Sequence, residues 1–360
     1  MSKGLSLYLD IMRFLMAFEV MLGHSTFHAY TGHGFLWQVD PFRHMSTAVI
    51  GFFVLSGFVI GFVSKTKEDN LRDYAHSRVA RMHSVIVPAL LVTFVFDALG
   101  RVIDPGFYTT WDFPSPIGPD QALSYFLSFF YINNLWFLPQ LMPGTNGPFW
   151  TMTYEVMFYA MFGAMYYLKG IGKHAITALL MVVAGKHILI LFPIWLIGLA
   201  TYHAQLRYPP PKMLGWLLFI ASLAGVVLCS NLRQGFQWPF TGRATHLDYA
   251  AGILIALNIY AAAGIAPALA SMLARYERTI RWFGMLTFSL YLCHRPLLNF
   301  FAVAAVDKPD SLIQKLWLFG GTFVVVIAVA YLGEWLRVRI KRWLDKGFDR
   351  REKIASAPLV

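Results

Sequence analysis

The chain has 360 residues, of which 57% are hydrophobic and only 14% are charged. This balance lies far outside that of an ordinary soluble domain and indicates a membrane protein. The formal net charge of +11 does not favour nucleic-acid binding, because Lys and Arg cluster in short segments between apolar runs. There they act as topology signals and meet the headgroups of anionic membrane lipids.

Continuous apolar runs predict an all-α fold, a polytopic bundle of transmembrane helices. Runs of about 18 or more residues can cross the roughly 30 Å hydrocarbon core as helices, whereas the strands of a β-barrel would be short and alternating. We expect about ten spans, in chain order at residues 5–27, 45–64, 82–100, 149–168, 174–186, 187–202, 213–231, 247–268, 282–303 and 314–336.

Loop charges orient this bundle. With the N-terminus in the cytoplasm, ten spans place the basic loops and the basic C-terminal segment on the inside, as the positive-inside rule requires. A full crossing by residues 122–138 would invert this order, so we expect an interfacial or re-entrant element there. The sequence thus predicts cytoplasmic termini, one membrane domain over residues 1–345 and a basic tail over 346–360. Asp10 and Glu19 lie in the first apolar run and no cleavage site follows it, which argues against a signal peptide.

The first span carries charged residues in its apolar sequence. A charge at mid-span costs about 2.5 to 3.5 kcal/mol on insertion scales and therefore needs a partner or a function. Asp10 and Arg13 are three residues apart and can pair on one face, although such a pair could serve insertion alone. Arg13 and His24 are eleven residues apart, which places them on nearly the same face and about 16 Å apart.

Two other spans carry ionisable residues at a similar expected depth. Trp150 is expected where the fourth span enters from the outside, with Glu155 about 8 Å below it. His294 lies past the midpoint of the ninth span, so we expect His24, Glu155 and His294 to form one polar site in the outer half. As alternatives, His24 could be a helix-contact histidine and His294 part of a polar cluster beside a proline. His24 and His28 have metal-ligand spacing, but no further ligand motif supports a metal site.

Five motifs, in chain order, resemble those of acyltransferase family 3, the membrane-bound O-acyltransferases that act on bacterial glycans. They are "LDIMRFLMAFEVMLGH" (9–24), "FFVLSGFVIGF" (52–62), "RVARMHSVIVP" (78–88), "PFWTMTYEVMFY" (148–159) and "TFSLYLCHRPL" (287–297). Thr151 stands where the family usually has Ser, and Pro88 lies further from Arg81 than the family's proline does. The second departure leaves the helix register there open.

The resemblance implies transfer of an acyl group, with acetyl expected, from acyl-CoA to a hydroxyl of a cell-surface or secreted carbohydrate. The protein would be a multi-pass protein of the bacterial inner membrane, with acyl-CoA as a substrate and no permanently bound cofactor. Arg13, Arg78 and Arg81, on the cytoplasmic half, would bind the phosphates of CoA. The remaining residues expected to position groups or substrates are Asp10, Trp150, Ser56 and Gly57.

A carbohydrate hydroxyl needs a general base, and histidine titrates in the range that suits this role. His24 is the expected base, with Glu155 or His294 orienting it, binding the acceptor or handling the proton of the thiolate. Two other classes stay open. One is a proton-coupled or lipid-linked-sugar transporter, although no pair of broken helices in matching halves is apparent. The other is an acyl-CoA-gated sensor without turnover.

Overall fold

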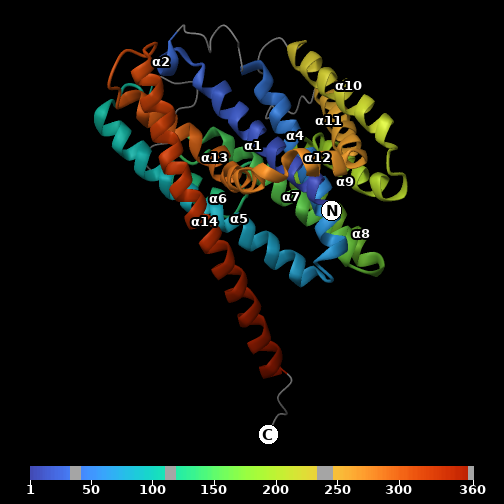
Figure 1. The fold of residues 1–360 in the computed structure, drawn as a ribbon. Coiled ribbons are helices and arrows are strands. Elements are labelled where there is room, and N and C mark those ends of the chain that lie inside the picture. Colours follow the sequence, from blue (N-terminus) through green and yellow to red (C-terminus); the bar gives the residue numbers. More distant parts are fainter. Residues whose placement is uncertain (33–41, 110–118, 233–245, 356–360) are drawn as a thin grey trace.

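A computed structural model describes residues 1–32, 42–109, 119–232 and 246–355. Every regular element within these ranges is a helix, as the sequence predicts (Figure 1). The helices of the N-terminal half are α1 (Lys3–Ser25), α2 (His28–Thr31), α4 (Phe42–Thr66), α5 (Leu71–Ile103), α6 (Pro119–Phe129), the 3-10 turn η1 (Gly147–Phe149) and α7 (Trp150–Tyr167). Those of the C-terminal half are α8 (Gly170–Leu189), α9 (Phe192–Arg207), α10 (Lys212–Asn231), α11 (His246–Gly264), α12 (Ala266–Leu273), the 3-10 turn η3 (Ala274–Tyr276), α13 (Glu277–Val303) and α14 (Leu312–Ala355).

Within the described ranges, five helices are long and apolar enough to cross a membrane, namely α4, α5, α10, α11 and α14. Helices α8 and α9 meet that standard only together, and they are bent by 101° at their junction, where the sequence predicts two separate spans. The total of about ten spans and the cytoplasmic termini remain predictions. Helix α1 is not among the helices that are apolar enough to cross a membrane, because Asp10, Arg13 and Glu19 fall within its apolar stretch.

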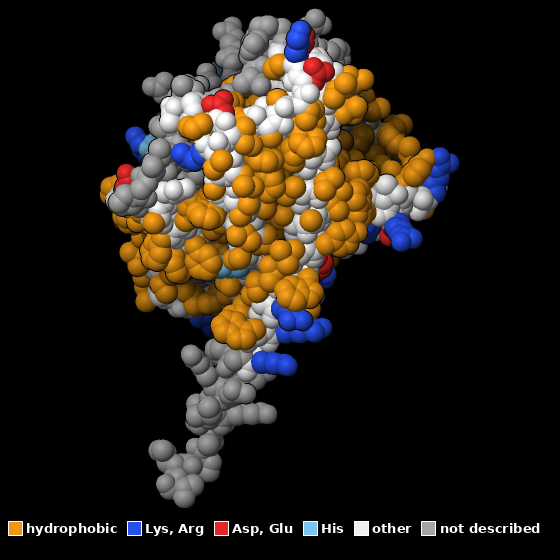
Figure 2. All heavy atoms as spheres, turned by 90° about the vertical axis from the view of Figure 1, so that its left-hand side faces the viewer, with side chains coloured by type: hydrophobic (Ala, Val, Ile, Leu, Met, Phe, Trp, Pro, Cys, Tyr) orange, Lys and Arg blue, Asp and Glu red, His pale blue; other side chains and the backbone are white. Residues whose placement is uncertain are grey.

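The surface of the molecule fits a lipid environment. Figure 2 shows a broad, nearly continuous hydrophobic face, with Lys and Arg mostly around its edges. Large apolar side chains such as Leu217 on α10 and Val324 on α14 are more than half exposed. Soluble monomers rarely expose an apolar surface of this extent, so the face is the one that contacts lipid.

Close helix packing forms the interior. Helix α1 packs against α4 and α13, and α4 packs against α9. A Cβ atom added to Gly57 would lie 2.0 Å from the backbone oxygen of Trp195, and one added to Gly198 would lie 1.9 Å from that of Val54. Glycine at both positions therefore lets the backbones of α4 and α9 touch, as small residues do at membrane-helix crossings.

The segment around α6 does not cross the bundle as one helix. Helix α6 has 11 residues, about 16 Å of helix, which is too short for a span. The chain that follows turns back inward, where the Asn146 side chain donates hydrogen bonds to the Leu292 backbone oxygen (2.7 Å) and to Thr93 Oγ1 (2.9 Å). Helix α7 consequently begins inside the bundle and not at its outer surface.

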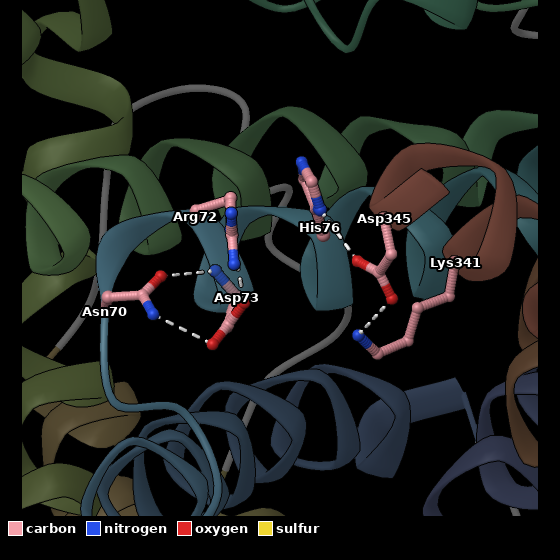
Figure 3. A network of polar contacts seen from close by, with 6 residues as sticks. All are labelled: Asn70, Arg72, Asp73, His76, Lys341 and Asp345. Carbon is pink, nitrogen blue, oxygen red and sulfur yellow. Dashed lines mark hydrogen bonds and ion pairs between the residues drawn. The ribbon is translucent and has the colours of Figure 1, made fainter. Parts of the chain in front are cut away.

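Helix α14 is fastened to α5 near the basic end of the chain. Asn70 Oδ1 accepts a hydrogen bond from the backbone N–H of Asp73 (2.9 Å) and so caps α5. One turn later His76 pairs with Asp345 of α14 (2.9 Å), which also binds Lys341 (3.2 Å; Figure 3). Beyond this contact α14, red in Figure 1, extends past the rest of the bundle.

Candidate active site

Two histidines that are 270 positions apart in sequence meet inside the bundle. His24 is in the last turn of α1 and His294 is near the middle of α13, and both helices pack along each other. Nδ1 of His24 lies 2.9 Å from Nε2 of His294. The two residues are only 8% and 0% exposed, so the pair is buried.

The hydrogen bonds of the pair fix where its protons sit. Nδ1 of His294 lies 3.0 Å from the Leu290 backbone oxygen. A carbonyl oxygen only accepts, so this nitrogen carries the hydrogen and Nε2 of the neutral ring is the acceptor. Nδ1 of His24 then carries a single hydrogen, which is shared between Nε2 of His294 and the Val20 backbone oxygen at 3.0 Å. Of the four ring nitrogens of the pair, Nε2 of His24 is thus the one that carries no hydrogen and accepts no hydrogen bond from the other ring.

A second polar cluster directly adjoins the pair on α13. The guanidinium of Arg295 stands over the rings of Phe27 and Tyr30, at 4.7 and 5.8 Å from their centroids. The hydroxyl of Tyr30 donates to Oδ1 of Asn299. Tyr30 belongs to the short helix α2, so this cluster holds α2 against α13 next to the histidines.

A cavity of about 660 Å³ lies on the opposite side of the histidine pair. Its walls come from α1, α4, α5, α7, α13 and α14. The charged side chains that line it are Asp10, Arg13, Arg78, Arg81, Glu155, Arg281, Glu334 and Arg337. Five arginines against three carboxylates make the cavity cationic, and we call it the arginine cavity.

Most of these arginines have carboxylate partners. Asp10 accepts from Arg13 and from Arg281, both at 2.6 Å, and Arg78 pairs with the buried Glu68 at 2.5 Å. Arg81 differs, because it is exposed and forms no ion pair with a carboxylate within the described ranges. Its guanidinium is therefore the group in the arginine cavity that is most available to an anion.

Glu155 lies in the arginine cavity and not beside the histidines. Its Oε1 accepts hydrogen bonds from Ser56 Oγ (2.5 Å) and from the Tyr159 hydroxyl. Ser56 Oγ in turn accepts from Trp195 Nε1 at 3.0 Å. No hydrogen bond joins Glu155 to either histidine, all three being described residues.

His24, Glu155 and His294 therefore do not lie together at one depth, although the sequence predicts that they do. That expectation places Trp150 at the outer surface, but Trp150 is only 4% exposed and packs against Tyr154, with 4.8 Å between ring centroids. Helix α7 starts deep in the bundle because the chain before it turns inward at Asn146. Glu155, just over one turn further along, therefore reaches the cationic side.

Tyr291 separates the arginine cavity from the histidine pair. It is the last residue of α13 that lines the cavity, and its ring centroid lies 6.3 Å from that of His294. Along α13 the cavity extends from Arg281 to Tyr291, about 15 Å, and His294 follows after about 4.5 Å more. No sequence pattern singles out Tyr291 or Arg281 as a site residue, although Tyr291 is one turn from His294 within the fifth motif.

Among the residues described, no group of three or more His, Cys, Asp or Glu side chains is placed to hold a metal ion. The side chain of His28 lies outside the described part of the chain.

Comparison with known proteins identifies the fold family. The family model described as an acyltransferase domain, that of acyltransferase family 3, matches residues 6–335. No curated protein and no solved structure matches the chain. The matched range includes both histidines and every arginine that lines the cavity except Arg337. The chain is a membrane acyltransferase and belongs to acyltransferase family 3.

Proposed function

We propose that this protein transfers an acyl group from acyl-CoA to a hydroxyl of a cell-surface or secreted carbohydrate. One observation carries the proposal: an arginine-lined cavity ends one helical turn from a buried histidine pair with a free nitrogen lone pair. An anionic donor and a hydroxyl acceptor are the substrates that such a combination suits.

The donor binds in the arginine cavity. The phosphates of CoA pair with the arginines of the cavity, above all with Arg81, which is exposed and forms no ion pair with a carboxylate among the described residues. The narrower pantetheine arm extends inward past Glu155, whose carboxylate accepts hydrogen bonds from its amide N–H groups. The thioester then lies at the inner end, beside Tyr291.

The histidine pair supplies the base. Nε2 of His24 takes the proton of the acceptor hydroxyl while the oxygen attacks the thioester carbonyl carbon, and the carbon–sulfur bond breaks. The imidazolium returns that proton to the CoA thiolate, so the products are the ester and CoA. His294 accepts from Nδ1 of His24 and is a positioning residue, which holds the tautomer that leaves Nε2 free.

The donor and the acceptor reach the pair from opposite sides. The arginine cavity lies at the end of the bundle that carries Met1 and the basic part of α14, which the positive-inside rule assigns to the cytoplasm. The acceptor then approaches from the side of α2. We accordingly propose a multi-pass protein of the bacterial inner membrane with cytoplasmic termini, its membrane domain over residues 1–345 and a basic tail over 346–360.

The test compares the surface and secreted glycans of three host strains by mass spectrometry. A deletion strain is complemented either with the wild type or with His24→Ala at equal membrane abundance. We expect one acyl-sized mass increment to disappear on deletion and to return only with the wild type. If deletion changes no glycan, the carbohydrate acceptor is wrong. If His24→Ala restores the increment, His24 is not the base.

A further inference from the structure

We infer that Tyr291 determines the length of the acyl chain that the enzyme transfers, because its ring closes the inner end of the arginine cavity. The inference rests on the proposed function, since it takes the arginine cavity as the donor site. It adds a specificity-determining residue that belongs neither to the arginines nor to the histidine pair.

The position of the ring is fixed on two sides. Tyr291 is 5% exposed, and its ring lies edge-on to Phe52, with 5.3 Å between centroids, and to His294, with 6.3 Å. Phe52 and Thr151 line the cavity at the same end. A thioester that extends inward from the arginines therefore meets the Tyr291 ring before it reaches the histidines.

Side chains next to the pair, among the described residues, are tightly enclosed. Met21 on α1 and Leu290 and Cys293 on α13 are all 0% exposed, and close-packed interiors contain few voids larger than a water molecule. When the acceptor oxygen at Nε2 of His24 attacks a thioester held at this inner end, the acyl chain lies beside the Tyr291 ring. A two-carbon acyl group fits next to such a ring, whereas each additional methylene group has to displace the ring further.

The size of the effect follows from known specificity limits. One methylene group in a tight apolar site changes kcat/KM by about 10- to 200-fold. Replacing the ring by a methyl group opens volume where the additional carbons would go. Tyr291→Ala should therefore raise the ratio of kcat/KM for hexanoyl-CoA to that for acetyl-CoA by about tenfold or more, while Tyr291→Phe, which keeps the ring, should leave the ratio unchanged.

The experiment uses the full chain in lipid nanodiscs, with a glycan extract from the deletion strain as the acceptor. Acetyl-CoA, butanoyl-CoA and hexanoyl-CoA are the donors, and release of the CoA thiol is measured. Phe300→Ala is the matched control, because it removes an aromatic ring from the same helix outside the arginine cavity. Tyr291→Leu replaces Tyr291→Ala if the latter does not fold.

The outcomes separate the inference from the proposal beneath it. A raised hexanoyl-to-acetyl ratio in Tyr291→Ala or Tyr291→Leu, but not in Phe300→Ala, supports the inference. An equal ratio in all variants, with an active wild type, overturns it and leaves the proposed function standing. If the wild type releases no thiol from any of the three donors, the proposed function fails and the inference fails with it.

Discussion

The histidine pair and the arginine cavity lie within one helical turn of each other on α13, yet they are built in opposite ways. The pair is buried, and its hydrogen bonds to backbone oxygens hold it in one tautomer. The cavity is open and carries more arginines than carboxylates. Proton transfer needs a fixed geometry, whereas an anionic donor needs charge that water can reach before binding. The arrangement thus keeps donor binding apart from the chemical step.

Of the changes that test this separation, loss of the base should have the largest effect, and it should act on kcat alone. For His24→Ala we expect kcat to fall by about 10² to 10⁴, the usual contribution of a general base, with the Kd for acetyl-CoA unchanged. Thiol-release kinetics and equilibrium binding measure the two quantities. A loss of donor binding in this variant would mean that the two regions are not separate.

Loss of the free arginine should give the reverse pattern. Removing one charge-assisted contact costs about 1.5 to 3 kcal/mol, so Arg81→Ala should weaken the binding of CoA roughly ten- to hundredfold. We expect kcat at saturating donor to stay near that of the wild type. Binding is measured at two salt concentrations, because an exposed ionic contact weakens as salt rises. Wild-type affinity in Arg81→Ala would place the phosphates elsewhere.

Arg81→Lys is the control for this variant. It retains the positive charge but loses the bidentate geometry of a guanidinium, so it should bind CoA with an affinity between those of the wild type and Arg81→Ala.

Glu155 gives a smaller but more diagnostic effect, since the sequence places it with the histidines and the structure places it in the cavity. Glu155→Gln keeps an oxygen that can accept from Ser56 and Tyr159 but loses the charge. We expect the KM for acetyl-CoA to rise by about tenfold or less, as for the weakening of one charge-assisted hydrogen bond. A fall in kcat as large as that of His24→Ala, with unchanged KM, would return Glu155 to the histidine side.

The contact between α5 and α14 should matter least. The Asp345 side chain is 42% exposed, and exposed ion pairs contribute about 0 to 1 kcal/mol. Asp345→Ala should therefore lower the free energy of unfolding in detergent by no more than about 1 kcal/mol and leave donor affinity unchanged. A marked loss of donor affinity would show that this contact holds α14 in the wall of the cavity.

The sequence by itself determined the class of the molecule and much of its candidate site. Apolar runs require helices in lipid, because no water is there to satisfy a free backbone. Ionisable residues within apolar runs point to Arg13, Glu155 and the two histidines, and the family resemblance adds the two arginines of "RVAR". Asp10 and Arg13 pair as their spacing on one helix predicts.

Only the tertiary structure decided which of these residues meet. Distances along one helix follow from its rise per residue, but the relative depth of two helices depends on how the intervening chain runs. The inward turn at Asn146 lowers the start of α7 and moves Glu155 to the cationic side. The contact of His24 with His294 and the closure of the cavity by Tyr291 likewise depend on packing between distant segments, which no local pattern encodes.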